Sequence, residues 1–152
     1  MTSVNGEAQV GSDHIAALLG RALTAIRAEI LVESEERYPD LRISHYRLME
    51  LIPSDGIRIT DLAESAAMTK QGLGQQVDYL EGLGYTESSR LRGDRRVRLV
   101  RRTPLGDEAM AFGRAAVGRV EAVWIDRLGR ERFELLREML AELGDLGRQP
   151  AL

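Results

Sequence analysis

The chain has 152 residues and a net charge of −3, and 43% of its residues are hydrophobic and 30% are charged. This balance is ordinary for a soluble protein of one domain, or of a small domain with helical extensions. No apolar run approaches the roughly 18 to 20 residues that span a bilayer, and residues 1–13 lack a signal-peptide pattern, so we expect a cytoplasmic protein. The absence of cysteine excludes disulfides, thiolate metal sites and thiol-based redox sensing.

The first predicted element is a long amphipathic helix. Residues 1–11 are polar and small, which favours a disordered tail. Ser12 or Asp13 can then cap a helix that runs to about Arg37, because apolar residues recur there at spacings of three and four. Pro39 ends this helix, since the residue before a proline is pushed out of the helical region.

Three shorter helices are predicted next, with a small strand between the first two. The first helix covers about residues 44–52, and the alternating apolar residues at 57–59 favour the strand. Thr60 is a good N-cap for a helix of about residues 61–66. The third helix, about residues 70–83, has a threonine cap before it and a glycine stop after it. The last two of these helices form a helix-turn-helix.

A β-hairpin follows, with arms at residues 86–90 and 96–102 and a turn at residues 92–95. In the second arm Val97 and Leu99 alternate with arginines, so we expect one apolar face and one cationic face. Because the hairpin comes directly after the helix-turn-helix, it is interpreted as the wing of a winged helix-turn-helix.

Positive charge is concentrated on this hairpin. Between residues 90 and 102 the chain has seven arginines and one aspartate, a local charge of +6, which leaves −9 for the remainder (−3 − 6). An acidic chain with one cationic projection suits a polyanionic partner, and the helix pair before the projection indicates duplex DNA. Taken alone, an arginine-rich hairpin is equally typical of a solvated sheet edge that discourages strand pairing.

Two long helices complete the chain. Thr103 and Pro104 supply a cap and a first-turn proline for a helix that runs to about Leu128. After Gly129, a last helix is predicted for residues 130–146. The apolar stripes of these helices and of the N-terminal helix exceed what a small middle domain can cover. We therefore expect a homodimer held together by an intermolecular helical bundle.

The fold class expected from this order is mainly α with a small β-hairpin wing. A winged helix-turn-helix DNA-binding lobe would cover residues 40–103. A helical dimerisation lobe would combine residues 12–38 with residues 104–147, and a short tail would follow at 148–152.

The predicted helix at residues 70–83 is the candidate recognition helix, because the second helix of a helix-turn-helix enters the major groove. Its candidate DNA contacts are Thr69, Lys70, Gln71, Gly74, Gln75 and Asp78. Thr69 and Lys70 stand at the helix start, where free backbone N–H groups and the helix dipole favour a phosphate. A glutamine can bond adenine through N6 and N7. The glycines at 72 and 74 lower helix propensity, and either close approach to DNA or neutral drift explains them.

The candidate DNA contacts of the wing are Arg92, Asp94, Arg95 and Arg96. The tip is short enough to enter a minor groove, where narrow A-tracts concentrate negative potential and favour arginine. Asp94 is unsuited to a phosphate contact. We expect its carboxylate to pair with an arginine, Arg96 in the first place, and to set the direction of that side chain.

Three runs of sequence resemble the MarR (multiple antibiotic resistance regulator) family of winged-helix transcription factors: residues 59–64 (ITDLAE), 68–71 (MTKQ) and 80–85 (LEGLGY). The family's wing signature, Asp-x-Arg before a strand that ends in Leu-Thr, is found from Asp94 to Thr103, with Arg102 in place of the leucine. Residues 104–106 match the usual opening of the family's fifth helix.

The resemblance implies a homodimeric DNA-binding regulator, usually a repressor of a nearby gene and often released by a small ligand. It implies that Arg96 is the minor-groove arginine and that Asp94 orients it. Gly72 and Gly74 depart from the family pattern, which bears on base contacts more than on the fold. Family members often have a ligand crevice between the two lobes, which makes His45 and Tyr46 candidate ligand contacts. A histidine at such a place more often satisfies a local hydrogen bond.

No catalytic constellation stands out, since the chain has no Gly-rich phosphate loop, no nucleophile elbow and no histidine pair at metal spacing. The sequence therefore indicates neither an enzyme nor a cofactor or metal site. The hypothesis is a sequence-specific repressor that binds a pseudo-palindromic operator in double-stranded DNA as a homodimer and responds to a small effector. The competing hypothesis is a winged-helix interaction module that uses its arginine-rich wing to hold an acidic protein.

Overall fold

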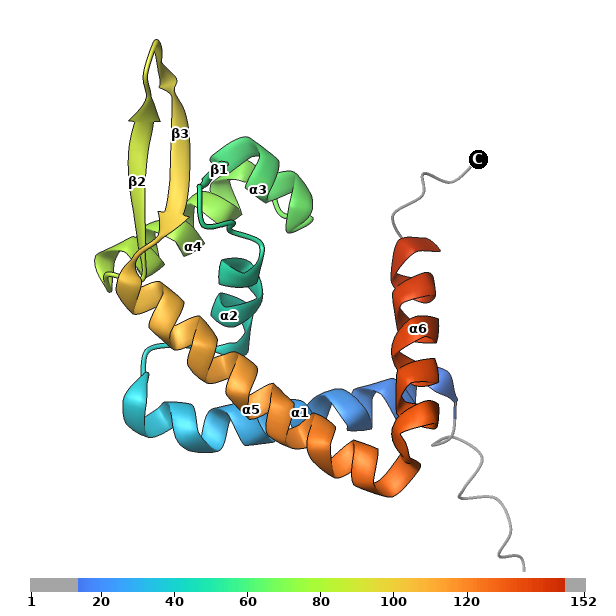
Figure 1. The fold of residues 1–152 in the computed structure, drawn as a ribbon. Coiled ribbons are helices and arrows are strands. Elements are labelled where there is room, and N and C mark those ends of the chain that lie inside the picture. The colour runs from blue at the N-terminus through green and yellow to red at the C-terminus, as the bar shows by residue number, and fades with distance from the viewer. Residues whose placement is uncertain (1–13, 147–152) are drawn as a thin grey trace, which may run out of the picture.

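The computed structural model describes residues 14–146. The expected tails, at 1–11 and 148–152, and the expected caps Ser12 and Asp13 lie outside the described residues. In order, the described chain forms α1 (Ile15–Arg37), α2 (Ile43–Glu50), β1 (Ile57–Arg58), α3 (Ile59–Ser65), α4 (Lys70–Gly82), β2 (Thr86–Leu91), β3 (Asp94–Arg102), α5 (Pro104–Leu128) and α6 (Arg130–Leu146) (Figure 1). The expected fold class, mainly α with a small β-hairpin, is confirmed.

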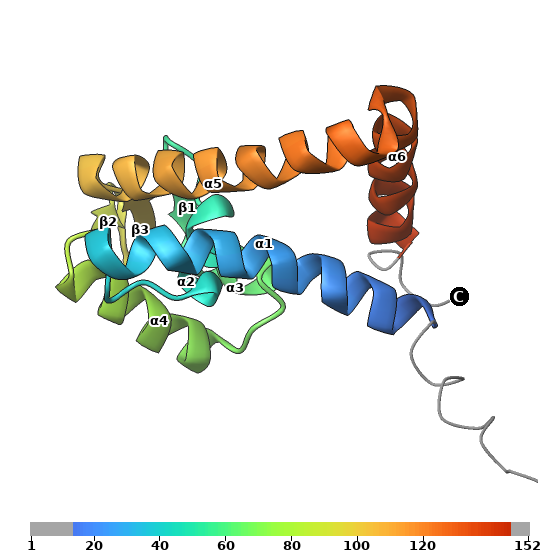
Figure 2. The ribbon, with the colours of Figure 1, turned by 90° about the horizontal axis from the view of Figure 1, so that it is seen from below.

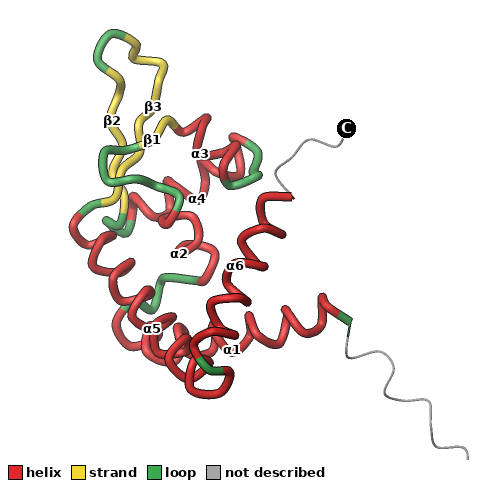
Figure 3. The backbone as a smooth tube through the Cα atoms, turned by 45° about the vertical axis from the view of Figure 1, so that its right-hand side comes forward, coloured by secondary structure: helices red, strands yellow, loops and turns green. Residues whose placement is uncertain are grey.

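The elements form a winged lobe and a lobe of long helices. In Figure 1, α3 and α4 lie at the base of the β2–β3 hairpin, which projects away from the rest of the chain. α1 and α5 pack against each other, and α6 turns away from the end of α5 (Figures 1 and 2). The tube in Figure 3 shows the same separation, with the strands at one end of the molecule and α1 and α5 at the other.

The three strands form one antiparallel sheet in the order β1-β3-β2. The register of the hairpin is regular up to Arg90, which faces Arg98, but the next residue, Leu91, faces Asp94. Residues 95–97 of β3 therefore lie between two pairs that are consecutive on β2. Such a bulge leaves residues unpaired and increases the local twist of the strand.

The turn of the hairpin is shorter than predicted. The sequence favoured a turn at residues 92–95, but β3 begins at Asp94, so only Arg92 and Gly93 connect the strands. Gly93 has a φ of 97°, a backbone conformation that glycine adopts without steric cost and that tight two-residue turns require.

The predicted division of β3 into an apolar and a cationic face is wrong. Val97 and Leu99 are only half-buried, whereas Val100 is completely buried. Because alternate residues of a strand share a face, Arg98 lies on the same side as Val100. The buried face contains an arginine because α4 supplies two carboxylates that pair with it.

The boundaries of α4, α5 and α6 agree with the prediction to within a residue, whereas the earlier helices differ. α1 is capped by His14, whose Nδ1 accepts a hydrogen bond from the backbone N–H of Ala17 at 3.2 Å. α2 is shorter than the predicted 44–52. The prediction that Thr60 caps the third helix is wrong, because the helix already begins at Ile59. β1 pairs only two residues with β3, so the chain turns into α3 at once and packs Ile59 on the core.

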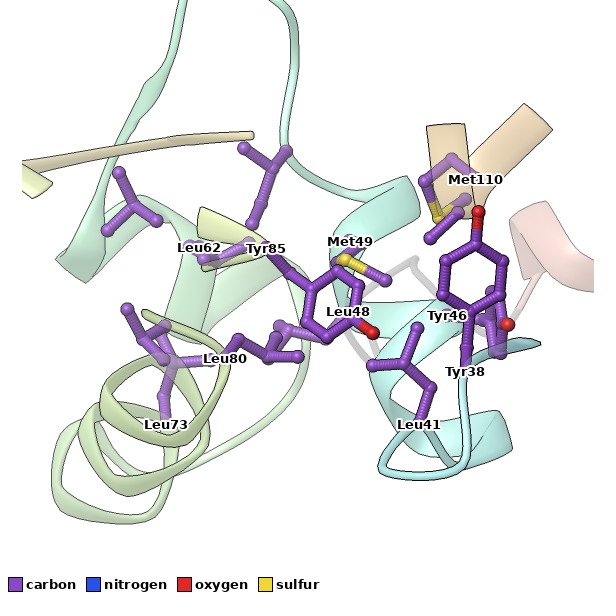
Figure 4. Packing of buried hydrophobic residues seen from close by; sticks show 14 of the residues in the cluster. Tyr38, Leu41, Tyr46, Leu48, Met49, Leu62, Leu73, Leu80, Tyr85 and Met110 are labelled. Atoms are coloured by element: carbon purple, nitrogen blue, oxygen red, sulfur yellow. The ribbon is translucent and has the colours of Figure 1, made fainter. Parts of the chain in front are cut away.

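One hydrophobic core runs through both lobes. In the winged lobe, Leu62 of α3 and Leu73 and Leu80 of α4 are completely buried. Met49 of α2 and Met110 of α5 continue the same cluster toward the long helices (Figure 4). Burial of each such side chain contributes roughly 1.5–3 kcal/mol. Because interiors are close-packed, the winged lobe, α2 included, cannot shift against α5 without opening this core.

α1 and α6 leave apolar side chains uncovered. They are Ile15, Leu18, Leu19 and Leu23 on α1, and Leu135, Met139, Leu140 and Leu143 on α6. Contiguous apolar surface of this kind is rare on soluble monomers and marks an interaction surface. Within residues 14–146, every helix is too short or too polar to form a membrane span.

Candidate nucleic-acid interface

α4 is held by one face and exposes the other. Leu73, Val77 and Leu80 are completely buried, so the helix docks on the core along a single stripe. The opposite side leaves Lys70, Gln71, Gln75 and Asp78 exposed. These four predicted DNA contacts are therefore accessible to a ligand outside the protein.

The start of α4 is capped by Thr69, as predicted. Its Oγ1 accepts a hydrogen bond from the backbone N–H of Gly72 at 3.1 Å. A Cβ at position 72 would lie 3.0 Å from this same oxygen, so a larger residue would press on the cap. A Cβ at position 74 would meet nothing within 4 Å. The cap thus explains the glycine at position 72. At position 74 a side chain would fit, and the glycine only removes bulk from the outer surface of the helix.

Three of the seven hairpin arginines are neutralised inside the protein. Arg98 pairs with Asp78 and Glu81, Arg101 with Glu87, and Arg102 with Asp107. The other four, Arg90, Arg92, Arg95 and Arg96, are exposed, and within residues 14–146 none of them has an acidic partner. Together with Asp94 they give the distal part of the hairpin a net charge of +3 (4 − 1), half of the value that the sequence suggested.

Arg98 joins the hairpin to α4. Its Nη2 donates hydrogen bonds to Asp78 Oδ1 and Glu81 Oε2, both at 2.8 Å, and its Nε donates to Ser88 Oγ at 2.8 Å. The Ser88 hydroxyl in turn donates to Glu81 at 2.7 Å. Burial favours the neutral acid at Glu81, but the hydrogen bonds from Ser88 and Arg98 outweigh it and lower the pKa of Glu81. This network fixes the angle between the wing and α4, and it occupies the carboxylate of Asp78.

Asp94 meets a different atom of Arg96 from the one expected. Its Oδ1 accepts a hydrogen bond from the backbone N–H of Arg96 at 3.0 Å. In the described part of the chain the predicted ion pair with the Arg96 guanidinium is not formed. The bulge at residues 95–97 places this backbone N–H beside the carboxylate, so Asp94 orients the start of β3 and leaves the guanidinium exposed.

Several solved structures have the same arrangement of elements, although no family model and no curated protein matches the sequence. The transcriptional repressor CouR bound to a 23-mer DNA duplex is 25% identical, with a TM-score of 0.70 over 91% of this chain and 99% of that one. CouR from Rhodococcus jostii RHA1 bound to p-coumaroyl-CoA is 20% identical, with a TM-score of 0.70 over 95% and 99%. Sco3205, a MarR family transcriptional regulator from Streptomyces coelicolor in complex with DNA, is 24% identical, with a TM-score of 0.68 over 90% and 87%.

This chain has the winged-helix fold of MarR family regulators. In this MarR-type fold α3 and α4 are the helix-turn-helix, and the β2–β3 hairpin is the wing. The resemblance carried by residues 59–64, 68–71 and 80–85 had placed these elements correctly.

A cavity of about 360 Å³ lies between α1, α2 and α5 of the MarR-type fold. Its lining is mostly apolar, with four charged side chains, Arg27, Arg47, Glu50 and Arg114. Tyr46, one of the two predicted ligand contacts, lines this cavity. Its buried hydroxyl has no hydrogen-bond partner within the described residues. Burial raises the pKa of Tyr46 to about 12, so the phenol is neutral at physiological pH.

His45, the other predicted ligand contact, is not among the side chains that line this cavity. Its Nδ1 accepts a hydrogen bond from the backbone N–H of Arg42 at 3.0 Å, at the start of α2. The ring packs on Tyr79 of α4, with 5.0 Å between the ring centroids. This is the local hydrogen bond that the sequence had favoured. Burial, and then the positive charge of Arg42, lower the pKa of His45.

Sequence reasoning missed the contact between α4 and the hairpin. A signal was present, because Asp78 and Glu81 are three residues apart and so share one side of the helix. Assigning that side to Arg98 needs the rotation of α4 about its axis and the register of β3. Both are decided by packing on the core.

Mild acid should lower the stability of the folded protein through His45. Its pKa in the folded state lies below the unfolded value of about 6.5, so the unfolded chain takes up the proton first. The free energy of unfolding should therefore decline as the pH falls below about 6.5, until the folded-state pKa is passed. We expect melting temperatures measured between about pH 7 and pH 5 to fall in the wild type and to fall less in His45→Gln.

His14→Asn is the matched control, because it removes the chain's other histidine and keeps a good N-cap on α1. It should retain the wild-type dependence of melting temperature on pH. Equal pH slopes for His45→Gln and the wild type would contradict the assignment.

Proposed function

We propose that this protein is a sequence-specific DNA-binding transcriptional regulator of the MarR type, which represses by binding a pseudo-palindromic operator as a homodimer in the cytoplasm. The observation that carries the proposal is the set of four exposed arginines on the wing, Arg90, Arg92, Arg95 and Arg96, which have no acidic partner in residues 14–146. They lie on the element that Arg98 joins to α4, whose outer face is polar and exposed.

The two elements suit two different contacts with a duplex. Phosphates attract the wing arginines without regard to sequence, and a narrow minor groove favours arginine in particular. Gln71 and Gln75 offer amide groups that can read base edges in the major groove. CouR and Sco3205, which share the fold, are each seen with DNA, and this supports the same use of α4 and the wing here.

The uncovered apolar faces of α1 and α6 support association with a second copy of the chain. A two-fold dimer presents two copies of α4 and two wings. Its operator would therefore contain two half-sites whose centres are one helical turn, about 10 base pairs, or a multiple of it apart.

The cavity between α1, α2 and α5 supports release by a small ligand. Its volume of about 360 Å³ falls in the range of about 300–1,000 Å³ typical of small-molecule sites. The apolar lining suits an aromatic or aliphatic body. Arg27 and Arg47 suit an anionic group on the ligand, whereas Arg114 already pairs with Glu50 at 3.0 Å. The unpartnered Tyr46 hydroxyl suits a hydrogen bond to the ligand. CouR, with the same fold, has been seen with p-coumaroyl-CoA.

Arg95→Ala combined with Arg96→Ala should remove most of the operator affinity. Loss of two charged hydrogen bonds to phosphate, at about 1.5 kcal/mol or more each, corresponds to roughly a hundredfold weaker binding. The slope of log affinity against log salt should also become shallower by about 0.9 for each lost phosphate contact. Fluorescence anisotropy with an operator selected from a random library would measure both.

The control for this double variant is Arg37→Ala with Arg137→Ala, which removes two exposed cations from the long helices. It should bind the operator as the wild type does. Undiminished affinity of the wing variant, with dimerisation and melting unchanged, would contradict the function. A wild type that selects no operator but retains an acidic protein in a salt-sensitive way would favour the interaction-module hypothesis.

Gln75→Ala should relax sequence preference at one position of each half-site. A bidentate contact to adenine discriminates by about 1–3 kcal/mol against the wrong base. Binding measured across a library of operator variants should therefore show a flattened preference at that position only. Unchanged preferences at every position would show that Gln75 reads no base.

The cavity can be tested with p-coumaroyl-CoA and a panel of aromatic carboxylates. A ligand from this panel should raise the melting temperature and release the operator. Arg47→Ala should weaken its binding by roughly tenfold, the equivalent of about 1.4 kcal/mol for one lost charged contact. Arg137→Ala is the control, because Arg137 is on α6 and does not line the cavity. If Arg47→Ala leaves ligand affinity unchanged, the anion is not bound in this cavity.

A further inference from the structure

Arg102, the last residue of β3, contacts two helices at once. Its Nη1 donates hydrogen bonds to the backbone carbonyls of Met49 at 2.8 Å and Ile52 at 2.7 Å. Its Nε donates to Asp107 Oδ1 at 2.7 Å. Only 11% of the side chain is exposed. A single guanidinium therefore bonds the end of α2 and the first turn of α5.

Each of these contacts is physically favourable. The last carbonyls of a helix have no partner within the helix, and a cation near the helix C-terminus interacts well with the helix dipole. Asp107, in the first turn of α5, is placed where a helix N-terminus favours negative charge. A nearly buried cation is costly unless it is fully paired, and these three hydrogen bonds supply the pairing. The guanidinium is thus confined to one position between the two helices.

The elements that Arg102 joins contribute to two different sites, the cavity and the wing. α2 contributes Tyr46 and Glu50 to the cavity, and α5 contributes Gly113 and Arg114. β3 contains the exposed arginines of the bulge at residues 95–97. Arg102 therefore connects both walls of the cavity to the base of the wing.

The neighbouring Arg101 has no such connection. It pairs with Glu87 across the hairpin at 2.6 Å, and both side chains are about half exposed. Arg101 and Arg102 are adjacent, have the same charge and end the same strand. Within the described residues, the hydrogen bond of Arg101 stays inside the sheet, whereas those of Arg102 reach α2 and α5. This difference makes Arg101 the matched control.

We propose that Arg102 is a positioning residue that sets the wing against α2 and α5, and that it couples the walls of the cavity to the affinity of the wing for DNA. This inference rests on the proposed DNA-binding function of the wing. It assigns to the one residue that departs from the family's wing signature a role that leucine, without a hydrogen-bond donor, cannot perform.

A double-mutant cycle tests the positioning role. Arg102→Met should weaken binding to the selected operator on the order of tenfold relative to Arg101→Met, which removes the same charge. If Arg102 acts through the wing, its substitution should have little further effect in an Arg96→Ala background. It should retain its full effect in a Gln75→Ala background, because Gln75 is on α4. General destabilisation would give equal losses in both backgrounds.

The inference is overturned if Arg102→Met binds the operator as tightly as Arg101→Met does. It is also overturned if the loss of affinity caused by Arg102→Met adds fully to the loss caused by Arg96→Ala. Where Arg102→Met does not fold, Asp107→Asn removes the ion pair, keeps both carbonyl contacts, and should give a smaller loss in the same direction. Failure of the proposed function is a separate result, in which the wild type selects no operator and Arg96→Ala has no effect.

Coupling to the cavity is tested without a ligand by Gly113→Ala. A Cβ at this position would lie 2.9 Å from the Tyr46 ring and would push α2 away from α5. This substitution should change operator affinity several-fold in the wild type and much less in Arg102→Met. Gly118→Ala, on the same helix with open space around it, should change neither. The coupling is overturned if Gly113→Ala leaves the operator affinity of the wild type unchanged. It is also overturned if Gly113→Ala changes operator affinity equally in the wild type and in Arg102→Met.

Discussion

α5 lies against the winged lobe at two glycines where a side chain would not fit. At Gly106 a Cβ would collide with the backbone carbonyl of Tyr85, and at Gly113 the ring of Tyr46 packs directly on the helix backbone. Gly106 follows closely after β3, so the first contact fixes the base of the wing. Gly113 lies two turns further along, so the second contact fixes α2. Because close-packed interiors transmit displacement, the sheet, α2 and the first half of α5 behave as one unit.

The charge on the hairpin depends on this unit as much as on the sequence. α4 and α5 approach the sheet closely enough to place Asp78, Glu81 and Asp107 beside Arg98 and Arg102. These arginines become structural, and the cations that remain for a polyanion are confined to the far half of the hairpin. The bulge contributes as well, because it removes residues 95–97 from the strand pairing and leaves Arg95 and Arg96 exposed. The wing is thus a smaller but more sharply located cationic surface than its composition suggests.

The apolar surface is divided in a similar way. The apolar stripes on α2, α3 and α4 are buried within the chain. Those on α1 and α6 leave apolar side chains exposed in residues 14–146. Such open faces are stable in water when a second copy covers them. The cavity lies next to them, between α1, α2 and α5. In the proposed regulator, ligand binding, association and wing placement would therefore share the same helices.

The sequence by itself determined the kind and order of the elements, because these depend on local chemistry. Periodicity, the Thr69 and Thr103 caps and the glycine stops predicted α4, α5 and α6 to within a residue. Family motifs over about 45 residues indicated the winged helix-turn-helix. The strand face could not be predicted, because it depends on which helix approaches the sheet. The Thr60 cap and the atom of Arg96 that Asp94 contacts were wrong as well, because the helix begins at Ile59 and the strand pairing has a bulge at residues 95–97. Only the tertiary structure decided which arginines stay free for DNA, because the neutralising carboxylates come from α4, α5 and the facing strand, up to 20 residues away in sequence.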